Sequence, residues 1–102
     1  MKPLEITEQN FDTEVLLSDK PVLLDFWAPS CGPCRMLSPV VDAFAETRDD
    51  IKFGKINVDE CEDLAARFDV MSIPLLVIIE NGEIKKTSAG YITEEQLAAL
   101  FG

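Results

Sequence analysis

Two cysteines three residues apart, in Cys31-Gly32-Pro33-Cys34, are the side chains best suited to chemistry. This spacing lets both sulfurs meet in a short ring, so the pair can cycle between a dithiol and a disulfide without distorting the rest of a fold. One further cysteine, Cys61, makes the total odd, so the three cannot form a disulfide framework. In a reducing compartment, a close pair of this kind is typical of catalytic or metal-binding thiols.

A metal site is the main alternative for the pair. Structural zinc and iron–sulfur clusters normally need four ligands. The chain has no histidine, and Cys61 is the one thiol left to add. We therefore expect no metal and no bound cofactor, and we interpret a Cys31–Cys34 disulfide as the redox-active group.

The elements around the pair favour Cys31 as the reactive thiol. A helix is expected to begin near Cys31, because an apolar stripe with helical spacing follows the pair: Met36, Leu37, Val40, Val41, Phe44 and Ala45. A helix N-terminus carries roughly half a positive charge from its unpaired N–H groups, and this field stabilises a thiolate. Cys31 is therefore the expected nucleophile, and the shielded Cys34 the resolving thiol. Between them, Gly32 and Pro33 support the site, since proline suits the first helical turn and stiffens the loop.

Strands and helices alternate along the rest of the chain. The near-continuous apolar run 22–27 predicts a central strand covered on both faces. Asn81-Gly82 is typical of a two-residue hairpin turn. Periodicity and turn residues predict the remaining elements, with strands at 4–6, 51–57, 75–79 and 84–89 and helices at 10–18, after 59 and at 93–101.

Two of these helices have recognisable N-terminal caps. Asp59 is the expected N-cap of the third helix with Glu62 as its capping-box partner, and Thr93 with Gln96 caps the last one. The order β-α-β-α-β-α-β-β-α predicts an α/β fold, a mixed five-stranded sheet flanked by four helices. We expect a single domain over residues 1–102.

Several separated motifs follow one another along the chain: 22–28 (VLLDFWA), 31–35 (CGPCR), 55–59 (KINVD), 72–74 (SIP) and Gly90. In these motifs the chain resembles the thioredoxin family over essentially its whole length, which implies the thioredoxin fold. The resemblance implies that Cys31 attacks a protein disulfide to form a mixed disulfide, and that Cys34 then releases the reduced substrate. It also implies that a thioredoxin reductase, linked to NADPH or to ferredoxin, restores the dithiol.

The resemblance also implies a substrate-docking surface beside the sulfurs. Pro74 is expected to be cis and to pack there, and a cis bond is uncommon enough to be a deliberate feature. The Ile73 backbone is expected to pair with an extended substrate segment. Gly90 either allows a close backbone approach near the site or ends a strand. Trp27 joins this surface, although a packing role is favoured for so large an aromatic side chain.

Asp25 is a carboxylate inside the apolar run 22–27. Burying a carboxylate is costly and raises its pKa, which makes Asp25 a candidate functional group. The resemblance gives it the role of proton acceptor for the Cys34 thiol, with Lys55 nearby to modulate it. The alternatives are an aspartate near water at the strand end and, for Lys55, an ordinary strand-surface charge.

The residue before Cys31 departs from the family pattern. Thioredoxins usually have tryptophan there, whereas this chain has Ser30, which removes a large apolar cover from the rim of the site. Ser30 is a candidate helix cap instead. After Pro74, where threonine is frequent, the chain has Leu75. The redox chemistry is expected to survive these changes, while partner choice and reductase compatibility depend on Ser30.

A general disulfide reductase is the leading hypothesis. Because Ser30 departs from the family pattern, a dedicated reductant of one partner is a second hypothesis. An oxidase is less favoured because strong oxidants need a more stabilised dithiol, and the intact motif argues against a mere scaffold.

Cys61 is assigned to the core, because Cys61, Leu64, Ala65 and Phe68 share one apolar helix face.

The net charge is −10, from 19 acidic and 9 basic residues. This charge argues against nucleic acid and anionic membranes as partners, and fits either solubility or selection of partners with basic docking surfaces. No segment approaches the ~18 apolar residues of a membrane span, and residues 1–8 lack the apolar core of a secretory signal. We expect a cytoplasmic monomer that acts on disulfide-containing proteins, although a mature form cut from a precursor would look the same.

Overall fold

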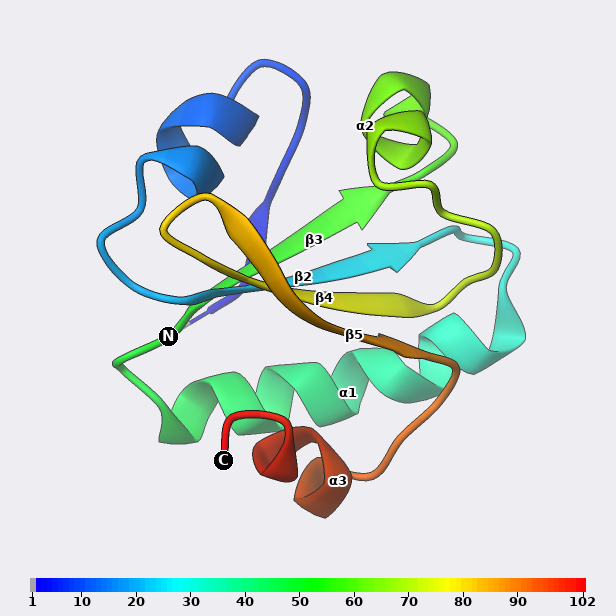
Figure 1. Ribbon diagram of the computed structural model, residues 1–102. Coiled ribbons are helices and arrows are strands. Elements are labelled where there is room, and N and C mark those ends of the chain that lie inside the picture. Colours follow the sequence, from blue (N-terminus) through cyan, green and yellow to red (C-terminus); the bar gives the residue numbers. More distant parts are fainter. Residues whose placement is uncertain (1) are drawn as a thin grey trace.

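The computed structural model describes residues 2–102 and shows a five-stranded sheet between two layers of helices (Figure 1). The elements follow the expected order: β1 (Leu4–Glu5), η1 (Asp12–Leu16), β2 (Val22–Trp27), α1 (Gly32–Thr47), β3 (Lys52–Asn57), α2 (Glu62–Arg67), β4 (Leu75–Glu80), β5 (Glu83–Ala89) and α3 (Glu94–Ala99). The first helical segment, η1, is π-helical rather than α-helical. The predicted α/β architecture is confirmed.

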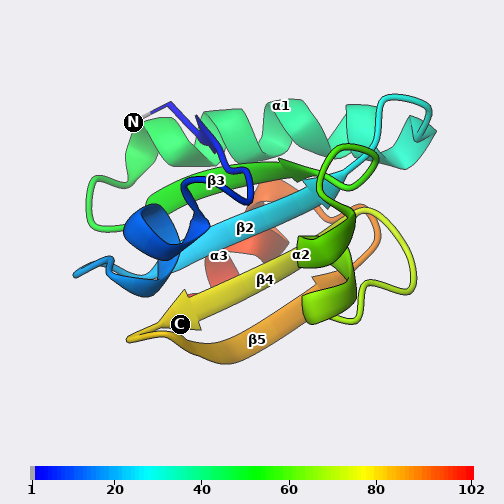
Figure 2. The ribbon, with the colours of Figure 1, turned by 90° about the horizontal axis from the view of Figure 1, so that it is seen from above.

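The strands are ordered β1-β3-β2-β4-β5, as Figure 2 shows for the four longer ones. β1, β3 and β2 run parallel, whereas β4 is antiparallel to both β2 and β5. Helix α1 carries the chain from β2 to its parallel neighbour β3, since parallel strands need such a crossover. Asn81 and Gly82, with φ of 53° and 78°, form the predicted hairpin turn between β4 and β5. β2 therefore lies in the middle of the sheet.

Side chains of β2 point alternately to two apolar cores, as the pleat requires. Val22, Leu24 and Phe26 belong to the core that η1 and α2 cover. Leu23 belongs to the core that α1 and α3 cover. Because Asp25 has the same parity as Leu23, its side chain points toward α1. Both faces of β2 are covered, as its apolar run predicts.

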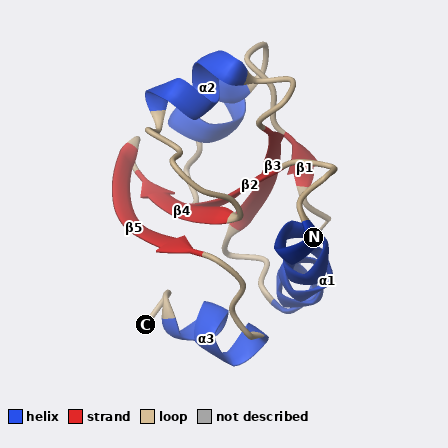
Figure 3. Cartoon of the chain, turned by 90° about the vertical axis from the view of Figure 1, so that its right-hand side faces the viewer, coloured by secondary structure: helices blue, strands red, loops and turns tan. Residues whose placement is uncertain are grey.

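The helices are divided between the two faces of the sheet (Figure 3), with α1 and α3 on one face and α2 on the other. The predicted capping box at α3 is confirmed: the Gln96 N–H donates to Thr93 Oγ1 at 3.2 Å, and the Thr93 N–H donates to Gln96 Oε1 at 3.0 Å. Within residues 2–102 we find no helix with the length and hydropathy of a membrane span.

The predicted cap at α2 is wrong. Asp59 lies outside the helix, and the N-cap position is held by Cys61, whose side chain makes no capping hydrogen bond. The backbone N–H of Asp63 instead donates to Glu8 Oε2 at 3.0 Å. A carboxylate distant in sequence therefore does what a local capping box was expected to do.

Candidate active site

Cys31 and Cys34 form a disulfide at the N-terminus of α1, with their Cα atoms 5.2 Å apart. Cys31 is the N-cap residue, and the backbone N–H of Cys34 donates to Cys31 Sγ at 3.1 Å. Gly32 and Pro33 occupy the first turn, where the missing N–H of proline leaves no helical hydrogen bond unmade. The predicted start of the helix is confirmed, and Cys31 lies in the field of a 16-residue helix.

The two cysteines differ in burial. Cys34 is only 2% exposed, whereas Cys31 is partly exposed. Of the two cysteines, Cys31 is therefore the more accessible to a second protein at this end of the sheet. Attack by Cys31 and resolution by Cys34 would require this asymmetry.

The loop before Cys31 corrects one prediction. Ser30 is exposed and does not cap α1, because Cys31 itself holds the N-cap position. The loop is fixed by the Cys31 N–H, which donates to the Ala28 carbonyl at 3.1 Å, and by the Arg35 guanidinium, which donates to the Pro29 carbonyl at 2.9 Å. Ser30 is therefore left in solvent directly beside Cys31.

A second loop brings a cis-proline to the same end of the sheet. The Ile73–Pro74 bond is cis, as expected. Because Leu75 at the start of β4 pairs with Phe26 near the end of β2, this loop and the cysteine loop leave the sheet together. Gly90 follows β5 with φ of +90°, and its N–H donates to the Pro74 carbonyl at 2.8 Å. A Cβ on Gly90 would meet nothing within 4 Å, so glycine is required here for its conformation at the strand end rather than for a close approach.

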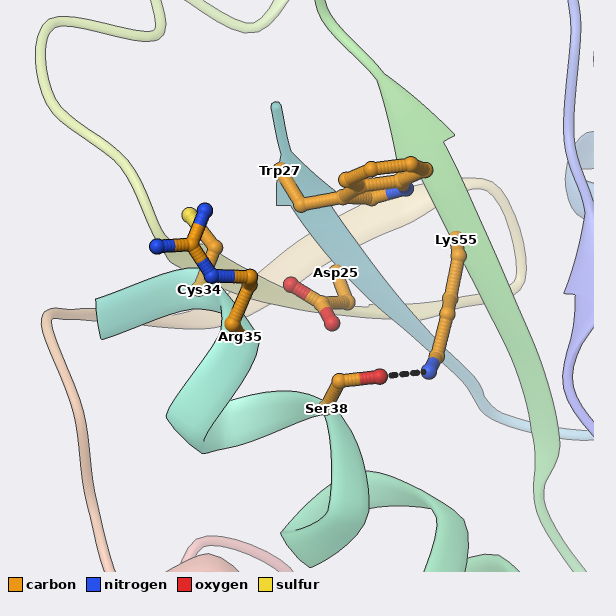
Figure 4. A pocket seen from close by; sticks show the side chains of 6 residues that line it. All are labelled: Asp25, Trp27, Cys34, Arg35, Ser38 and Lys55. Atoms are coloured by element: carbon orange, nitrogen blue, oxygen red, sulfur yellow. Dashed lines mark hydrogen bonds between the residues drawn. The ribbon is translucent and has the colours of Figure 1, made fainter. Parts of the chain in front are cut away.

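A cavity of about 220 Å³ lies beside Cys34 on the α1 side of the sheet (Figure 4). Its walls come from β2, β3 and the first turns of α1, and its lining residues are Asp25, Trp27, Cys34, Arg35, Ser38 and Lys55. Figure 4 shows the Asp25 carboxyl between α1 and β3, with the ring of Trp27 on one side. The cavity therefore joins the resolving cysteine to the predicted proton acceptor.

Asp25 is 2% exposed, and its Oδ1 has no hydrogen-bond partner within residues 2–102. Burial raises the pKa of Asp25 to about 6, while the Lys55 ammonium opposes this rise and the Asp42 carboxylate adds to it. An aspartate near water at the strand end does not fit this burial. A carboxyl with such a pKa can exchange a proton close to neutral pH.

Lys55 lies directly across from Asp25 in the pairing of β2 with β3. Its ammonium donates to Ser38 Oγ at 2.7 Å and forms an ion pair with Asp42 Oδ1 at 2.9 Å. Both partners belong to α1, so Lys55 ties the helix to the sheet. These contacts hold the Lys55 ammonium against α1, and its positive charge opposes the rise in the pKa of Asp25.

Ser38 and Asp42 are site residues that the sequence pattern alone did not single out. They follow Cys34 at intervals of four residues, so the three side chains share one face of α1. This spacing beside the apolar stripe of the same helix could have indicated Ser38 and Asp42 as site residues. Their shared contact with Lys55 could not be predicted in this way, because Lys55 comes from another element.

Cys61 lies apart from the redox pair. It is 3% exposed in the core under α2, and its Sγ lies 3.9 Å from the Ile6 carbonyl oxygen. Burial raises the pKa of the Cys61 thiol. This position agrees with its assignment to the core.

Across residues 2–102 there is no cluster of three or more histidine, cysteine or acidic side chains that could hold a metal ion.

Comparison with known proteins shows which family the chain resembles. The family model described as Thioredoxin matches residues 2–101. The chain is 46% identical over 96 residues to the thioredoxin of Haemophilus influenzae, covering 93% of this chain and 90% of that protein. It is 47% identical over 98 residues to the thioredoxin of Porphyra purpurea (95% and 92%), and 43% identical over 101 residues to that of Bacillus subtilis (98% and 95%). Its fold, its disulfide at the start of α1 and these similarities together place the chain in the thioredoxin family, as a thiol–disulfide oxidoreductase.

Proposed function

We propose that this chain works as a protein-disulfide reductase, with Cys31 as the nucleophile and Cys34 as the resolving thiol. The observation that carries the proposal is the asymmetry of the pair: Cys31 caps α1 and is partly exposed, whereas Cys34 is buried beside the cavity. The Cys34 N–H and the helix field both stabilise negative charge on Cys31 Sγ. That charge favours the thiolate, which is the form that attacks a disulfide.

The reaction starts from the dithiol. The Cys31 thiolate attacks one sulfur of the substrate disulfide, the substrate S–S bond breaks, and the other substrate sulfur leaves as a thiolate that takes a proton from water. Cys34 then loses its proton and attacks Cys31 Sγ, which forms the Cys31–Cys34 bond and releases the second substrate thiolate. The substrate disulfide gains two electrons, and the cysteine pair loses two.

Asp25 accepts the Cys34 proton in this scheme, and Lys55 modulates the charge of Asp25. Two observations support these roles. Asp25 and Cys34 line one cavity, and Cys34 is buried from bulk water, so a nearby base is needed. With a pKa of about 6, Asp25 is mostly ionised at neutral pH and is a stronger base than an ordinary carboxylate.

The substrate docks on Trp27, Ser30, Ile73 and Gly90 in this proposal, with Pro74 as support. The cysteine loop and the cis-proline loop leave the sheet at the same end, which supports this surface. The hydrogen bond from Gly90 to the Pro74 carbonyl holds the second loop against β5. An extended substrate segment would pair with the Ile73 backbone.

The partners are disulfide-containing proteins and a thioredoxin reductase, linked to NADPH or to ferredoxin, that restores the dithiol. The net charge of −10 favours partners with basic docking surfaces. We further propose that the chain acts as a monomer and that residues 1–102 form one domain. The family match over residues 2–101 supports the single domain. A cytoplasmic location is supported by the cysteine usage, a redox pair with the free Cys61 buried.

Reduction of a disulfide-bonded protein such as insulin tests the function. With dithiothreitol as the electron source, the wild-type chain and a Cys61→Ser control should both accelerate reduction well above the rate of the small thiol alone. Cys31→Ser should abolish the acceleration. No acceleration by the wild-type chain would refute a general reductase.

Ser30 favours a second candidate, a dedicated reductant of one partner. The exposed serine beside Cys31 removes apolar contact area from the surface that a generic substrate would touch. The reduction potential of the pair separates either reductant from an oxidase, because thioredoxin lies near about −270 mV and a strong oxidant near about −120 mV. Turnover of insulin then separates the general from the dedicated reductant. A thioredoxin-like potential with weak insulin turnover would support the dedicated reductant.

A further inference from the structure

We propose that Ser38 and Asp42 are positioning residues that hold the Lys55 ammonium between the Asp25 cavity and the protein surface, and thereby set the proton affinity of Asp25. The inference rests on the proposed function, in which Asp25 accepts the Cys34 proton. Neither Ser38 nor Asp42 touches the reacting sulfurs in this scheme. Ser38 acts through Lys55, whereas Asp42 acts both through Lys55 and by its own charge, which raises the pKa of Asp25. Ser38 and Asp42 therefore act on Asp25 in opposite directions.

The contacts of Lys55 place its ammonium at a boundary. Ser38, whose Oγ accepts from Lys55 Nζ at 2.7 Å, lines the cavity that holds Asp25. Asp42, whose Oδ1 lies 2.9 Å from Nζ, lines a second hollow of about 420 Å³ that also includes Glu46. Lys55 lines both spaces. Ser38 therefore holds the ammonium on the cavity side, and Asp42 holds it on the outer side.

The burial of the groups agrees with this division. The side chain of Lys55 is 21% exposed and that of Asp42 is 54% exposed, so the ion pair lies at the edge of the protein. Figure 4 shows the Lys55 side chain running along the cavity past Asp25, to end at Ser38. A small movement of the ammonium between its two partners would therefore change its distance from the Asp25 carboxyl.

The charged and titratable groups that face Asp25 come from two elements. α1 contributes Cys34, Arg35 and Asp42, and β3 contributes Lys55. Cys34 does not titrate in the disulfide form, and the Arg35 guanidinium donates to a carbonyl in the preceding loop. From β4, the residue paired with Asp25 is apolar. Lys55 and Asp42 are therefore the groups whose charges act on Asp25 in the oxidised protein.

Removing either partner of Lys55 should move the pKa of Asp25, with opposite signs. In Ser38→Ala the ammonium keeps only Asp42 and moves outward, so Asp25 loses part of a favourable charge and its pKa rises. In Asp42→Asn one negative charge disappears and the ammonium stays with Ser38, so the pKa of Asp25 falls. Each change should be roughly half a pKa unit, as expected for charges several ångströms apart in a partly hydrated site.

The experiment follows the carbon-13 signal of the Asp25 carboxyl against pH in the disulfide form of the intact chain. Ser38→Ala and Asp42→Asn are compared with the wild type. Glu46→Gln is the matched control, because it removes an acidic charge from the outer hollow one helical turn beyond Asp42. It should leave the Asp25 titration nearly unchanged. Ser38→Thr keeps a hydroxyl and should restore the wild-type value.

A double-mutant cycle tests whether Ser38 acts through Lys55. In a Lys55→Met background, Ser38→Ala should no longer move the Asp25 titration. Shifts of the same sign in Ser38→Ala and Asp42→Asn, or a Ser38→Ala shift that persists without Lys55, would overturn the proposal. The titration needs no turnover, so its result can be read even where the proposed reductase activity is not found. If the titration shifts as expected but the pH midpoint of mixed-disulfide resolution does not follow it, the positioning stands and the role of Asp25 as proton acceptor fails.

Discussion

The backbone N–H of Cys34 donates a hydrogen bond to Sγ of Cys31 across 3.1 Å, so the buried cysteine contributes a donor to the exposed one. A sulfur that accepts a hydrogen bond at a helix N-terminus holds negative charge more easily than one without such a donor. The chemical difference between the two cysteines therefore follows from the first turn of α1.

The first prediction concerns the order of attack. Cys34→Ser should accumulate a stable mixed disulfide between Cys31 and a disulfide-bonded protein, because no second thiol can reach the Cys31 sulfur. Cys31→Ser should form none, since Cys34 is buried. Intact mass measurement of the adducts checks this, with Cys61→Ser as a control that still completes the cycle. Trapping at Cys34 in the Cys31→Ser variant would reverse the assignment.

The second prediction concerns pH and stability. Burial raises the pKa of Asp25 from 3.8 to about 6, so between these values the folded chain binds more protons than the unfolded chain. Stability then falls as pH rises through this window, and the loss is complete above it. About two pKa units correspond to about 3 kcal/mol. The non-titrating variant Asp25→Asn should escape this loss.

Urea unfolding of the disulfide forms at pH 4 and pH 7.5 measures the effect. Relative to the wild type, Asp25→Asn should gain up to about 3 kcal/mol in free energy of unfolding between the two pH values. Using the disulfide form keeps Cys31 and Cys34 from titrating. A stability difference that stays the same at both pH values would show that Asp25 titrates alike in the folded and unfolded chains.

The third prediction concerns the rim of the site. Ser30→Trp restores the large apolar side chain that thioredoxins usually carry beside the first cysteine. If the missing cover restricts partners, the variant should raise kcat/KM for generic protein disulfides several-fold, while small disulfides respond little. Ser30→Ala is the control, because it removes the hydroxyl without adding area. Equal kcat/KM for all three chains would argue against a specificity role for Ser30.

The fourth prediction concerns packing at β3. A Cβ on Gly54 would lie 2.5 Å from Cγ1 of Ile6 and 3.1 Å from Cδ2 of Leu24, and both of these side chains are buried. Gly54→Ala should therefore destabilise the fold by about 1–3 kcal/mol through overpacking. Gly32→Ala, where a Cβ meets nothing within 4 Å, is the control for thermal unfolding. A wild-type melting temperature for Gly54→Ala would mean that the side chains around Gly54 can move aside with little loss of stability.

Local sequence patterns predicted most of the fold, and they failed where a contact joins residues that are distant in sequence. The run 22–27 indicated a strand covered on both faces, and the Thr93–Gln96 box indicated the start of α3, because burial periodicity and capping depend on neighbours in sequence. At the start of α2 the Asp63 N–H donates to Glu8, which is 55 residues away in sequence. A rule based on neighbouring residues could not predict this contact.

The site shows the same division. The order Cys31-Gly32-Pro33-Cys34 was enough to place both thiols on the first turn, and the burial of Asp25 followed from its apolar neighbours. The partners of Lys55 did not follow, because they depend on how α1 packs across β3. Serine is a frequent N-cap residue, which makes Ser30 the expected cap, but the sulfur of Cys31 accepts the capping hydrogen bond instead.

Cys61 makes the oxidised chain a reporter of its own local opening. With Cys31 and Cys34 joined, Cys61 is the remaining thiol, and it is enclosed between α2 and the segment around Ile6. A thiol-specific reagent can reach it only when that layer separates from the sheet. The labelling rate of the disulfide form therefore measures how often the helical layer opposite α1 opens, on a timescale separate from electron transfer at the other face.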